Sequence, residues 1–215
     1  MENKKILLVG GGGHCASVLD CLLDMDRFDA IGIIDPKGPD SEKTLNIPVV
    51  GTDDDLERLH REGWNYAFVT LGSVGNTALR RKLFCILQKI GYEIPVIIDP
   101  SALVARDVKL ESGTFVGKRA IVNARSRIGA GAIVNSGAII EHDCRIGDFV
   151  HIGPGATLCG GVQVGNDSHI GAGSVVKQLL AVGSRVLVGS GSNVVKSLPE
   201  GVVAYGNPCK AVNKP

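Results

Sequence analysis

The chain has 215 residues, a hydrophobic content of 44% and a formal net charge of +1. These values are typical of a globular protein with one or two domains. The near-neutral charge and the small number of stacking side chains, three Tyr and one Trp, argue against nucleic acid as a partner. The apolar run at residues 6–9 is too short for a signal peptide or a membrane span, so we expect a cytoplasmic protein that binds no membrane.

Residues 1–96 are expected to form an α/β domain, and residues 97–215 a second domain of a different kind. The predicted elements of the first are a strand at 6–9, a helix at 16–23, strands at 31–34 and 66–71, and helices at 53–62 and 77–90. The first three make a β-α-β unit. Pro95 and Pro100 bracket the change in composition, and the short apolar run 96–98 leads into the second domain.

A glycine-rich loop, Gly10-Gly-Gly-Gly-His14, follows the first predicted strand and satisfies the pattern G-x-G-x-x-A from Gly11 to Ala16. Asp35 follows at the end of the second strand. Glycines let the backbone approach a phosphate, and a helix N-terminus offers free N–H groups. Fewer than about a hundred residues precede the second domain, which favours a nucleotide-sugar over a dinucleotide. A tight turn without ligand, capped by His14, is the alternative.

From Ile98 to Val194 every sixth residue is Val, Ile or Leu, seventeen times in succession. A helix repeats at about 3.6 residues and a strand at about 2, so this period indicates a solenoid. The fifth position of the hexad is mostly small or β-branched and the second is often Gly, which predicts a narrow apolar interior and tight corners. Three hexads make a triangular coil of 18 residues, stacked on the next at about 4.8 Å, so residues 18 apart are neighbours.

His142 lies between Glu141 and Asp143 at the third position of its hexad, which predicts that it faces outward near a corner. An imidazole beside a carboxylate is the arrangement that general-base catalysis needs, although the sequence leaves open which acid assists. Gly160 lies one coil further along the same face. Its backbone N–H is placed to stabilise an oxyanion next to the imidazole.

Two other histidines, His151 and His169, are 18 residues apart and are expected to stack on another face. His142 and His151 are half a coil apart and are expected to meet only across a subunit boundary. For His169 we expect a solvated surface residue. Cys144 occupies an inward position and is expected in the core, and the six cysteines have neither C-x-x-C nor metal-ligand spacing, which predicts no disulfide and no metal site.

The pattern I-G-x-G-A, at residues 128–132 and 152–156, resembles the repeat of the left-handed β-helix acyltransferases. The segment 206–210 is similar to the G-x-P-A-K that closes many of them, with Cys209 in place of Ala. The resemblance extends over nearly the whole chain to the NeuD/PglD-type acetyltransferases of sialic acid and bacillosamine pathways. It rests on the glycine loop, the Ile34-Asp35 strand end, Leu71-Gly72, Asn135, residues 141–144, His151 and Cys159-Gly160. The predicted fold class is an α/β Rossmann-like domain followed by an all-β left-handed parallel β-helix.

This resemblance implies acetyl-CoA-dependent acetylation of the amine of a nucleotide-activated amino sugar, of the UDP-4-amino-4,6-dideoxy type, by direct attack in a bacterial glycan pathway. It implies a homotrimer with acetyl-CoA between two β-helices, and no metal. His142 would be the general base, assisted by Asp143. The residues implied for acetyl-CoA are His151, Gly160, Ala172 and Ser190, and those for the sugar nucleotide are Gly12, Gly13, His14, Asp35, Gly72 and Asn135. Pro36 stands where the bacillosamine-type pattern has a second acid, which leaves the nucleotide base open.

Three other functions stay open at this point. The acceptor could be a hydroxyl, as in O-acetylation of sialic acid or another sugar. The solenoid could be a noncatalytic scaffold that presents a binding surface. An NAD-dependent enzyme built on the glycine loop ranks last, because the solenoid gives it no site for a hydride acceptor.

Overall fold

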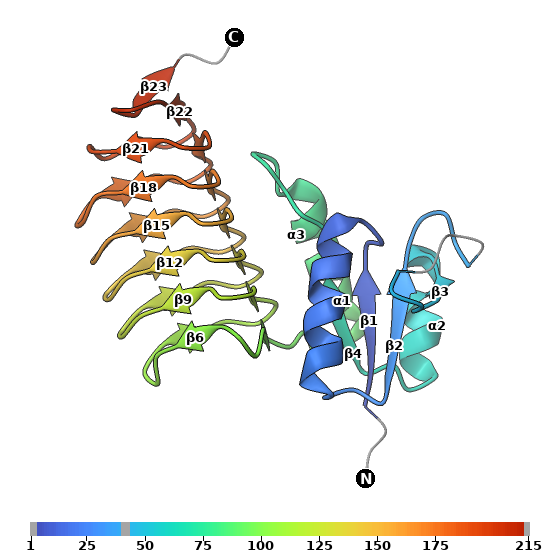
Figure 1. Cartoon of the computed structure of the whole chain (residues 1–215). Helices are drawn as coiled ribbons and strands as arrows, with labels where there is room; N and C mark the ends of the chain where they lie inside the picture. The colour runs from blue at the N-terminus through green and yellow to red at the C-terminus, as the bar shows by residue number, and fades with distance from the viewer. Residues whose placement is uncertain (1–3, 40–43, 213–215) are drawn as a thin grey trace. The chain divides into compact units, whose positions relative to one another are not determined.

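The computed structural model describes residues 4–39 and 44–212, and the chain divides into two compact units (Figure 1). The first unit comprises Met1–Gly72 and Ala78–Pro100, and the second comprises Ser73–Thr77 and Ser101–Pro215. The five residues Ser73–Thr77 thus belong to the second unit although the first unit surrounds them in sequence. Within the described ranges, no helix is long and apolar enough to cross a membrane.

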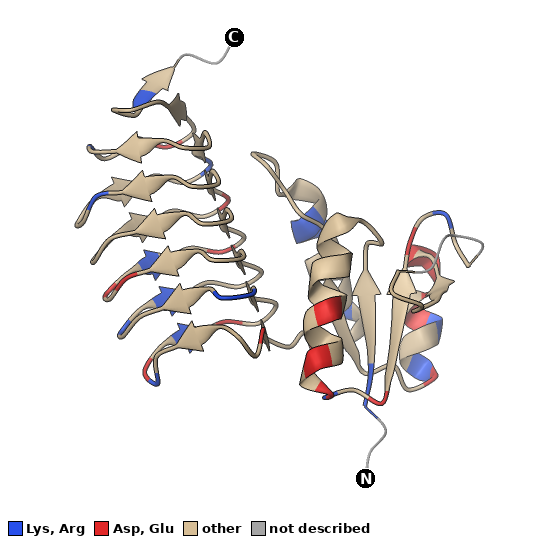
Figure 2. Cartoon of the chain, viewed as in Figure 1, with Lys and Arg blue, Asp and Glu red and all other residues tan. Residues whose placement is uncertain are grey.

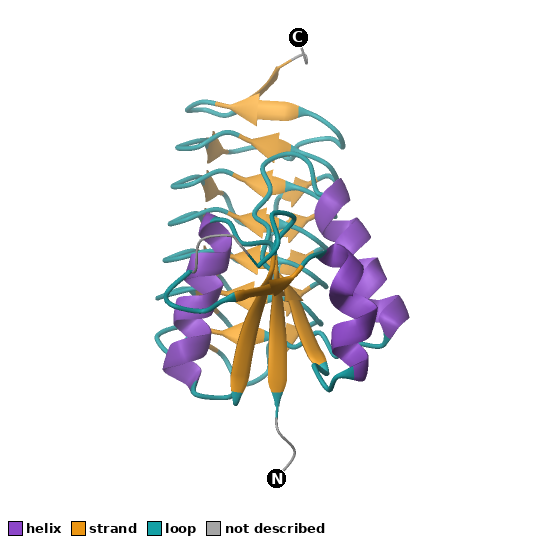
Figure 3. Cartoon of the chain, turned by 90° about the vertical axis from the view of Figure 1, so that its right-hand side faces the viewer, coloured by secondary structure: helices purple, strands orange, loops and turns teal. Residues whose placement is uncertain are grey.

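The first unit is a parallel sheet covered by helices on both faces (Figure 3). Its sheet has the order β3-β2-β1-β4, and its short β5 follows the last helix. The strands are β1 (Lys5–Val9), β2 (Ala30–Ile34), β3 (Val49–Gly51), β4 (Tyr66–Val69) and β5 (Ile97–Ile98). The helices are α1 (Gly13–Met25), the 3₁₀ turn η1 (Asp53–Asp55), α2 (Leu56–Arg61) and α3 (Ala78–Ile90). Helix α1 covers one face, and α2 and α3 cover the other, as right-handed crossovers require.

The strands of this sheet are apolar because both of their faces are buried. Ile6, Leu7 and Leu8 of β1 are each fully buried. This confirms the predicted β-α-β unit, with two differences. Strand β3 was not predicted, because its three residues are too few to give a period. Helix α1 begins at Gly13, three residues before the predicted start at residue 16, so the glycine loop supplies its first turn.

The second unit is a parallel β-helix with three flat faces of two-residue strands (Figure 1). We call them faces 1, 2 and 3 in chain order. Face 1 contains β6 (Leu103–Val104), β9 (Ile121–Val122), β12 (Ile139–Ile140), β15 (Thr157–Leu158), β18 (Val175–Val176) and β21 (Asn193–Val194). Face 2 contains β7 (Lys109–Leu110), β10 (Arg127–Ile128), β13 (Arg145–Ile146), β16 (Gln163–Val164) and β19 (Ala181–Val182). Face 3 contains β8 (Phe115–Val116), β11 (Ile133–Val134), β14 (His151–Ile152), β17 (His169–Ile170), β20 (Leu187–Val188) and β22 (Val203–Tyr205), closed by the antiparallel β23 (Lys210–Val212).

Residues 18 apart pair across adjacent coils, as the hexad predicted. His151 pairs with His169, and Ile152 pairs with Ile170, in parallel register. The second residue of each strand points inward, so Ile152 and Ile170 are fully buried. The fifth hexad position also points inward, and Cys144 there is fully buried, which confirms its place in the core.

The turns between faces occur at the fourth hexad position rather than at the glycine-rich second one. Every fourth-position residue from Gly113 to Gly191 has a left-handed φ, including the non-glycine Arg125 (φ 60) and Asp143 (φ 62). Glycine is required at many second positions for a different reason, namely that a side chain there would collide with the next coil. A Cβ at Gly165 would lie 2.5 Å from the backbone nitrogen of Ser184.

We therefore expect Gly165→Ala to lower the free energy of unfolding by about 2–3 kcal/mol, because the clash is with backbone that cannot move aside. The matched variant is Gly137→Ala at a fourth position, where φ is 66° and a Cβ would meet nothing within 4 Å. It should cost about 1 kcal/mol, the penalty of the left-handed conformation alone. Urea unfolding of both variants measures the difference, and equal losses would contradict this assignment of the two glycine positions.

Candidate active site

His142 and Asp143 lie at the corner between faces 1 and 2, in the turn from β12 to β13. The Nδ1 atom of His142 lies 2.7 Å from Oδ2 of Asp143. Adjacent side chains in a strand point apart, but the left-handed φ of Asp143 returns its carboxylate to the side of the imidazole. Arg125, one coil earlier, and then His142 hold the pKa of Asp143 well below its usual range. The carboxylate therefore accepts a hydrogen bond from Nδ1–H, which leaves a lone pair on Nε2.

Gly160 lies directly beside that lone pair, one coil further on. A Cβ at this position would lie 2.7 Å from Nε2 of His142, so only glycine leaves the space open. In the described part of the chain, the Gly160 N–H donates no hydrogen bond, while its carbonyl accepts one from Leu179. An imidazole acceptor and a free backbone donor thus lie together at one corner, as the 18-residue spacing predicted.

Asn135 and His151 meet near the opposite edge of face 1. The His151 Nδ1–H donates to the carbonyl oxygen of Ser73 at 2.9 Å, and Nε2 accepts from Nδ2 of Asn135 at 3.1 Å. These two contacts fix the neutral tautomer of His151. Ser73 was not predicted, and no spacing in the sequence would have indicated it.

His169 is not a solvated surface residue, and that prediction was wrong. Its exposed fraction is 9%, its ring packs edge-on against His151 at a centroid distance of 4.8 Å, and burial lowers its pKa below the ordinary value. The reason is that Ser73–Thr77 covers face 3, where Gly75 approaches Leu187 and Thr77 donates to Asp167. A covering segment that is distant in sequence leaves no trace in the local hexad.

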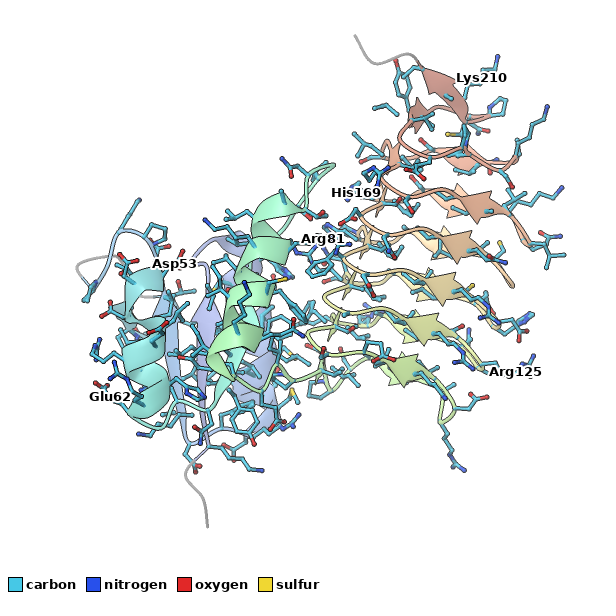
Figure 4. All side chains as sticks on the ribbon, turned by 180° about the vertical axis from the view of Figure 1, so that it is seen from behind. Asp53, Glu62, Arg81, Arg125, His169 and Lys210 are labelled. Atoms are coloured by element: carbon cyan, nitrogen blue, oxygen red, sulfur yellow. The ribbon has the colours of Figure 1, made fainter. Side chains whose placement is uncertain are left out.

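Ala172 and Ser190 lie at the corner between faces 3 and 1, on consecutive coils, in the turns that follow β17 and β20. Asn135 follows β11 at the same corner. One chain therefore gathers the predicted site residues at two corners, with His142 and Gly160 at one and Asn135, Ala172 and Ser190 at the other. Face 1 separates them. In Figure 4, Arg125 at the corner between faces 1 and 2 and His169 on face 3 lie on opposite sides of the β-helix.

The glycine loop lies at the carboxyl edge of the sheet in the first unit, where parallel α/β sheets bind ligands. The Gly11 N–H donates to Oδ2 of Asp35 at 3.2 Å, and the Lys37 N–H donates to Oδ1 at 3.0 Å. Asp35 therefore supports the loop from the end of β2. Gly12 caps helix α1 without a side chain, and a Cβ on Gly12 or Gly13 would meet nothing within 4 Å.

The remaining loop residues complete this edge. His14 is the second residue of α1, and a Cβ at Gly72, beyond β4, would lie 3.8 Å from the Cβ of His14. The structure thus brings together Gly12, Gly13, His14, Asp35 and Gly72, while Asn135 lies in the other unit. Within the described ranges, no group of three or more His, Cys, Asp or Glu side chains could hold a metal ion.

Sequence reasoning missed Arg125, although the signal was present. It lies 18 residues before Asp143, and its guanidinium contacts that carboxylate with Nε–Oδ1 and Nη2–Oδ2 distances of 2.6 and 2.8 Å.

Family models match the chain at two places, the PglD N-terminal domain at residues 5–87 and the six-repeat bacterial transferase hexapeptide at residues 143–178. A mutant perosamine N-acetyltransferase from Caulobacter crescentus, solved with CoA and GDP-perosamine, is 36% identical with a TM-score of 0.92, and the match covers 98% of this chain and 97% of that chain. The acetyltransferase domain of PglB from Neisseria gonorrhoeae, solved with acetyl coenzyme A, is 34% identical with a TM-score of 0.91, over 98% and 100% of the two chains.

WeeI from Acinetobacter baumannii, at 24% identity and a TM-score of 0.86 over 97% of this chain and all of its own, shares the fold. A comparison with curated protein sequences gives no match. The matches confirm that the β-helix is left-handed, as the resemblance to the hexapeptide acyltransferases implied.

Proposed function

Because the chain belongs to the NeuD/PglD-type family of acetyl-CoA-dependent sugar N-acetyltransferases, we propose that it acetylates the amine of a nucleotide-activated 4-amino-4,6-dideoxy sugar. The observation that carries the proposal is the corner at His142, where an Nε2 lone pair, oriented by Asp143, lies beside the free N–H of Gly160. The 36% identical Caulobacter relative binds CoA and GDP-perosamine, which supports the same class of substrates here.

In the proposed reaction the sugar amine attacks the thioester carbonyl of acetyl-CoA directly. As the C–N bond forms, Nε2 of His142 takes a proton from the amine nitrogen, and the carbonyl oxygen becomes an oxyanion beside the Gly160 N–H. The tetrahedral intermediate then collapses, the C–S bond breaks, and the imidazolium returns its proton to the CoA sulfur. Asp143 keeps the imidazole in the required tautomer throughout.

The sugar nucleotide is proposed to bind at the glycine loop of the first unit. The exposed N-terminus of α1 at Gly12 and Gly13 has N–H groups for the diphosphate, and His14 and Gly72 border the same edge. Both carboxylate oxygens of Asp35 already accept hydrogen bonds from backbone N–H groups. We therefore propose that Asp35 fixes the conformation of the loop as well as binding the ligand. We place the reaction in the cytoplasm, where acetyl-CoA and nucleotide-activated sugars are made.

We further propose that the active protein is a homotrimer packed through face 1. The corner at His142 is convex, and the His142 side chain is 58% exposed, so the corner needs a partner surface to enclose acetyl-CoA. The outward residues of the first five strands of face 1 are Leu103, Ile121, Ile139, Thr157 and Val175, with Leu103 66% and Val175 41% exposed, and the sixth strand presents Asn193. The strands of this face contain no acidic or basic residue. Figure 2 shows β15, β18 and β21 in tan throughout. An exposed apolar stripe of this kind favours association.

Threefold packing through face 1 also completes the site. Two corners border face 1, so each His142 corner would adjoin the corner of a neighbouring subunit that carries Asn135, Ala172 and Ser190. The pantetheine arm of acetyl-CoA would then lie between two β-helices. His151 would approach the acetyl group or the incoming amine from that neighbour.

Thiol release from acetyl-CoA tests the proposed function. The panel contains UDP- and GDP-linked 4-amino-4,6-dideoxy sugars and, for the hydroxyl alternative, free sialic acid. We expect turnover with at least one nucleotide-linked amino sugar and a product in which the amine nitrogen carries the acetyl group. Turnover with hydroxyl acceptors alone would contradict N-acetylation, and the absence of both acetyl-CoA binding and turnover would favour a noncatalytic scaffold.

A further inference from the structure

The carboxylate of Asp143 is held from two sides. Arg125 contacts both of its oxygens, with Nε–Oδ1 at 2.6 Å and Nη2–Oδ2 at 2.8 Å, and His142 Nδ1 contacts Oδ2 at 2.7 Å. Arg125 occupies the same left-handed corner position one coil earlier, so its side chain runs along the β-helix to reach Asp143. Its own backbone N–H donates to Oδ1 of Asp107, another coil earlier, which fixes the base of the side chain.

We propose that Arg125 is a positioning residue for acetyl transfer, which fixes the Asp143 carboxylate against the imidazole and shares its negative charge. The inference rests on the proposed role of His142 as the base. A planar guanidinium fork bonded to both oxygens fixes the plane of the carboxylate, as a lysine cannot. Asp143 then presents Oδ2 to Nδ1 in one orientation, and Nε2 faces the space beside Gly160.

The fork also places a positive charge against the carboxylate that contacts His142. A carboxylate beside an imidazole stabilises the imidazolium, and a nearby cation opposes this effect. The charged or titratable residues at this corner are Glu141, Asp143, Cys144 and Arg145 on the coil of His142, Arg125, Arg127 and Asp107 on the preceding coils, and Cys159 on the next coil. Arg125 is the cation that contacts the carboxylate bonded to His142.

Stability alone does not explain this contact. The side chains of Arg125 and Asp143 are 65% and 41% exposed, and ion pairs at such exposure contribute little to the free energy of unfolding. Arg185 provides a matched comparison, because it also occupies a left-handed corner position and pairs with a carboxylate, Glu200, but at the corner between faces 2 and 3. The two arginines differ in that only Arg125 contacts a carboxylate bonded to His142.

The test is the pH dependence of kcat for the full-length enzyme, with saturating acetyl-CoA and the amino sugar that the wild type turns over. For Arg125→Gln we expect the fall of kcat on the acidic side of the pH profile (the acidic limb) to occur about half a pH unit or more higher. The reason is that no cation in contact with Asp143 then offsets the attraction between Asp143 and the imidazolium. The loss of kcat should accordingly be greater at pH 6 than at pH 8.5. Arg125→Lys should return the acidic limb towards its wild-type position, because the positive charge is restored. Its maximal kcat at the plateau of the profile should stay lower, because lysine cannot bond both carboxylate oxygens as the guanidinium does.

Arg185→Gln should leave both the limb and the plateau unchanged, and the KM for acetyl-CoA should be unaffected in all three variants. An acidic limb for Arg125→Gln that coincides with the wild type, or a shift of equal size in Arg185→Gln, would overturn the inference. His142→Ala separates this from the proposed function. If that variant is inactive while Arg125→Gln has the wild-type profile, only the role of Arg125 is wrong; if His142→Ala is active, the proposed base is wrong as well.

Discussion

Replacement of His142 by alanine is expected to lower the kcat of sugar acetylation by about 10²- to 10⁴-fold, the usual contribution of a general base. The amine must lose a proton as it attacks, and Nε2 is the acceptor placed for that proton. The KM for acetyl-CoA should change little, because the imidazole contributes to the transition state rather than to ground-state binding. Steady-state thiol release at several acetyl-CoA concentrations separates the two parameters.

The two acids beside His142 provide the control. Asp143→Asn keeps the size of the side chain but can present an amide to Nδ1, so we expect a loss of about tenfold or more. Glu141→Gln removes the acid on the other side, for which the structure gives no contact with the imidazole, and should stay near wild type. A larger loss in Glu141→Gln than in Asp143→Asn would contradict the pairing seen at 2.7 Å.

The six-residue period correctly predicted which residues of the β-helix are neighbours on successive coils. Because the period is six and the coil has three sides, the neighbourhood of His142 with Gly160 and of His151 with His169 followed from counting. The same count would have found Arg125 beside Asp143. Adjacency in sequence is a weaker guide at these corners, because the left-handed residue decides whether two neighbouring side chains meet.

Contacts between the β-helix and segments outside the repeat could not be predicted from the six-residue period. The burial of His169 depends on Ser73–Thr77, a segment outside the repeat that covers face 3. The same segment supplies the carbonyl that sets the tautomer of His151. The choice of Asp143 over Glu141 depends on a backbone φ of 62°. This left-handed φ recurs at every fourth hexad position from 113 to 191, but half of these residues are not glycine, so the residue types alone do not reveal it.

If each active site is formed by two neighbouring subunits, two different inactive variants should regain activity when they assemble into the same trimer. A site formed within one chain would not show this complementation. His142→Ala removes the base at one corner. Ala172→Arg fills the other corner, where the pantetheine arm is proposed to lie, and should prevent acetyl-CoA from binding. Each variant alone has three defective sites, but a mixed trimer contains sites that pair an intact His142 corner with an intact Ala172 corner of the neighbour.

With random assembly from equal amounts, about a quarter of all sites in the whole mixture take both intact corners. Each mixed trimer has one such site of its three, so the isolated mixed trimers should regain about a third of wild-type activity. Co-expression of the two chains with different affinity tags, followed by capture through both tags, isolates the mixed trimers, and their mass should be three times the 22.5 kDa of one chain plus the tags. The double variant His142→Ala with Ala172→Arg, mixed with the His142→Ala chain, is the control and should stay inactive. Complementation requires that the two corners face each other across a subunit boundary, so mixed trimers without activity would show that each chain builds its site alone.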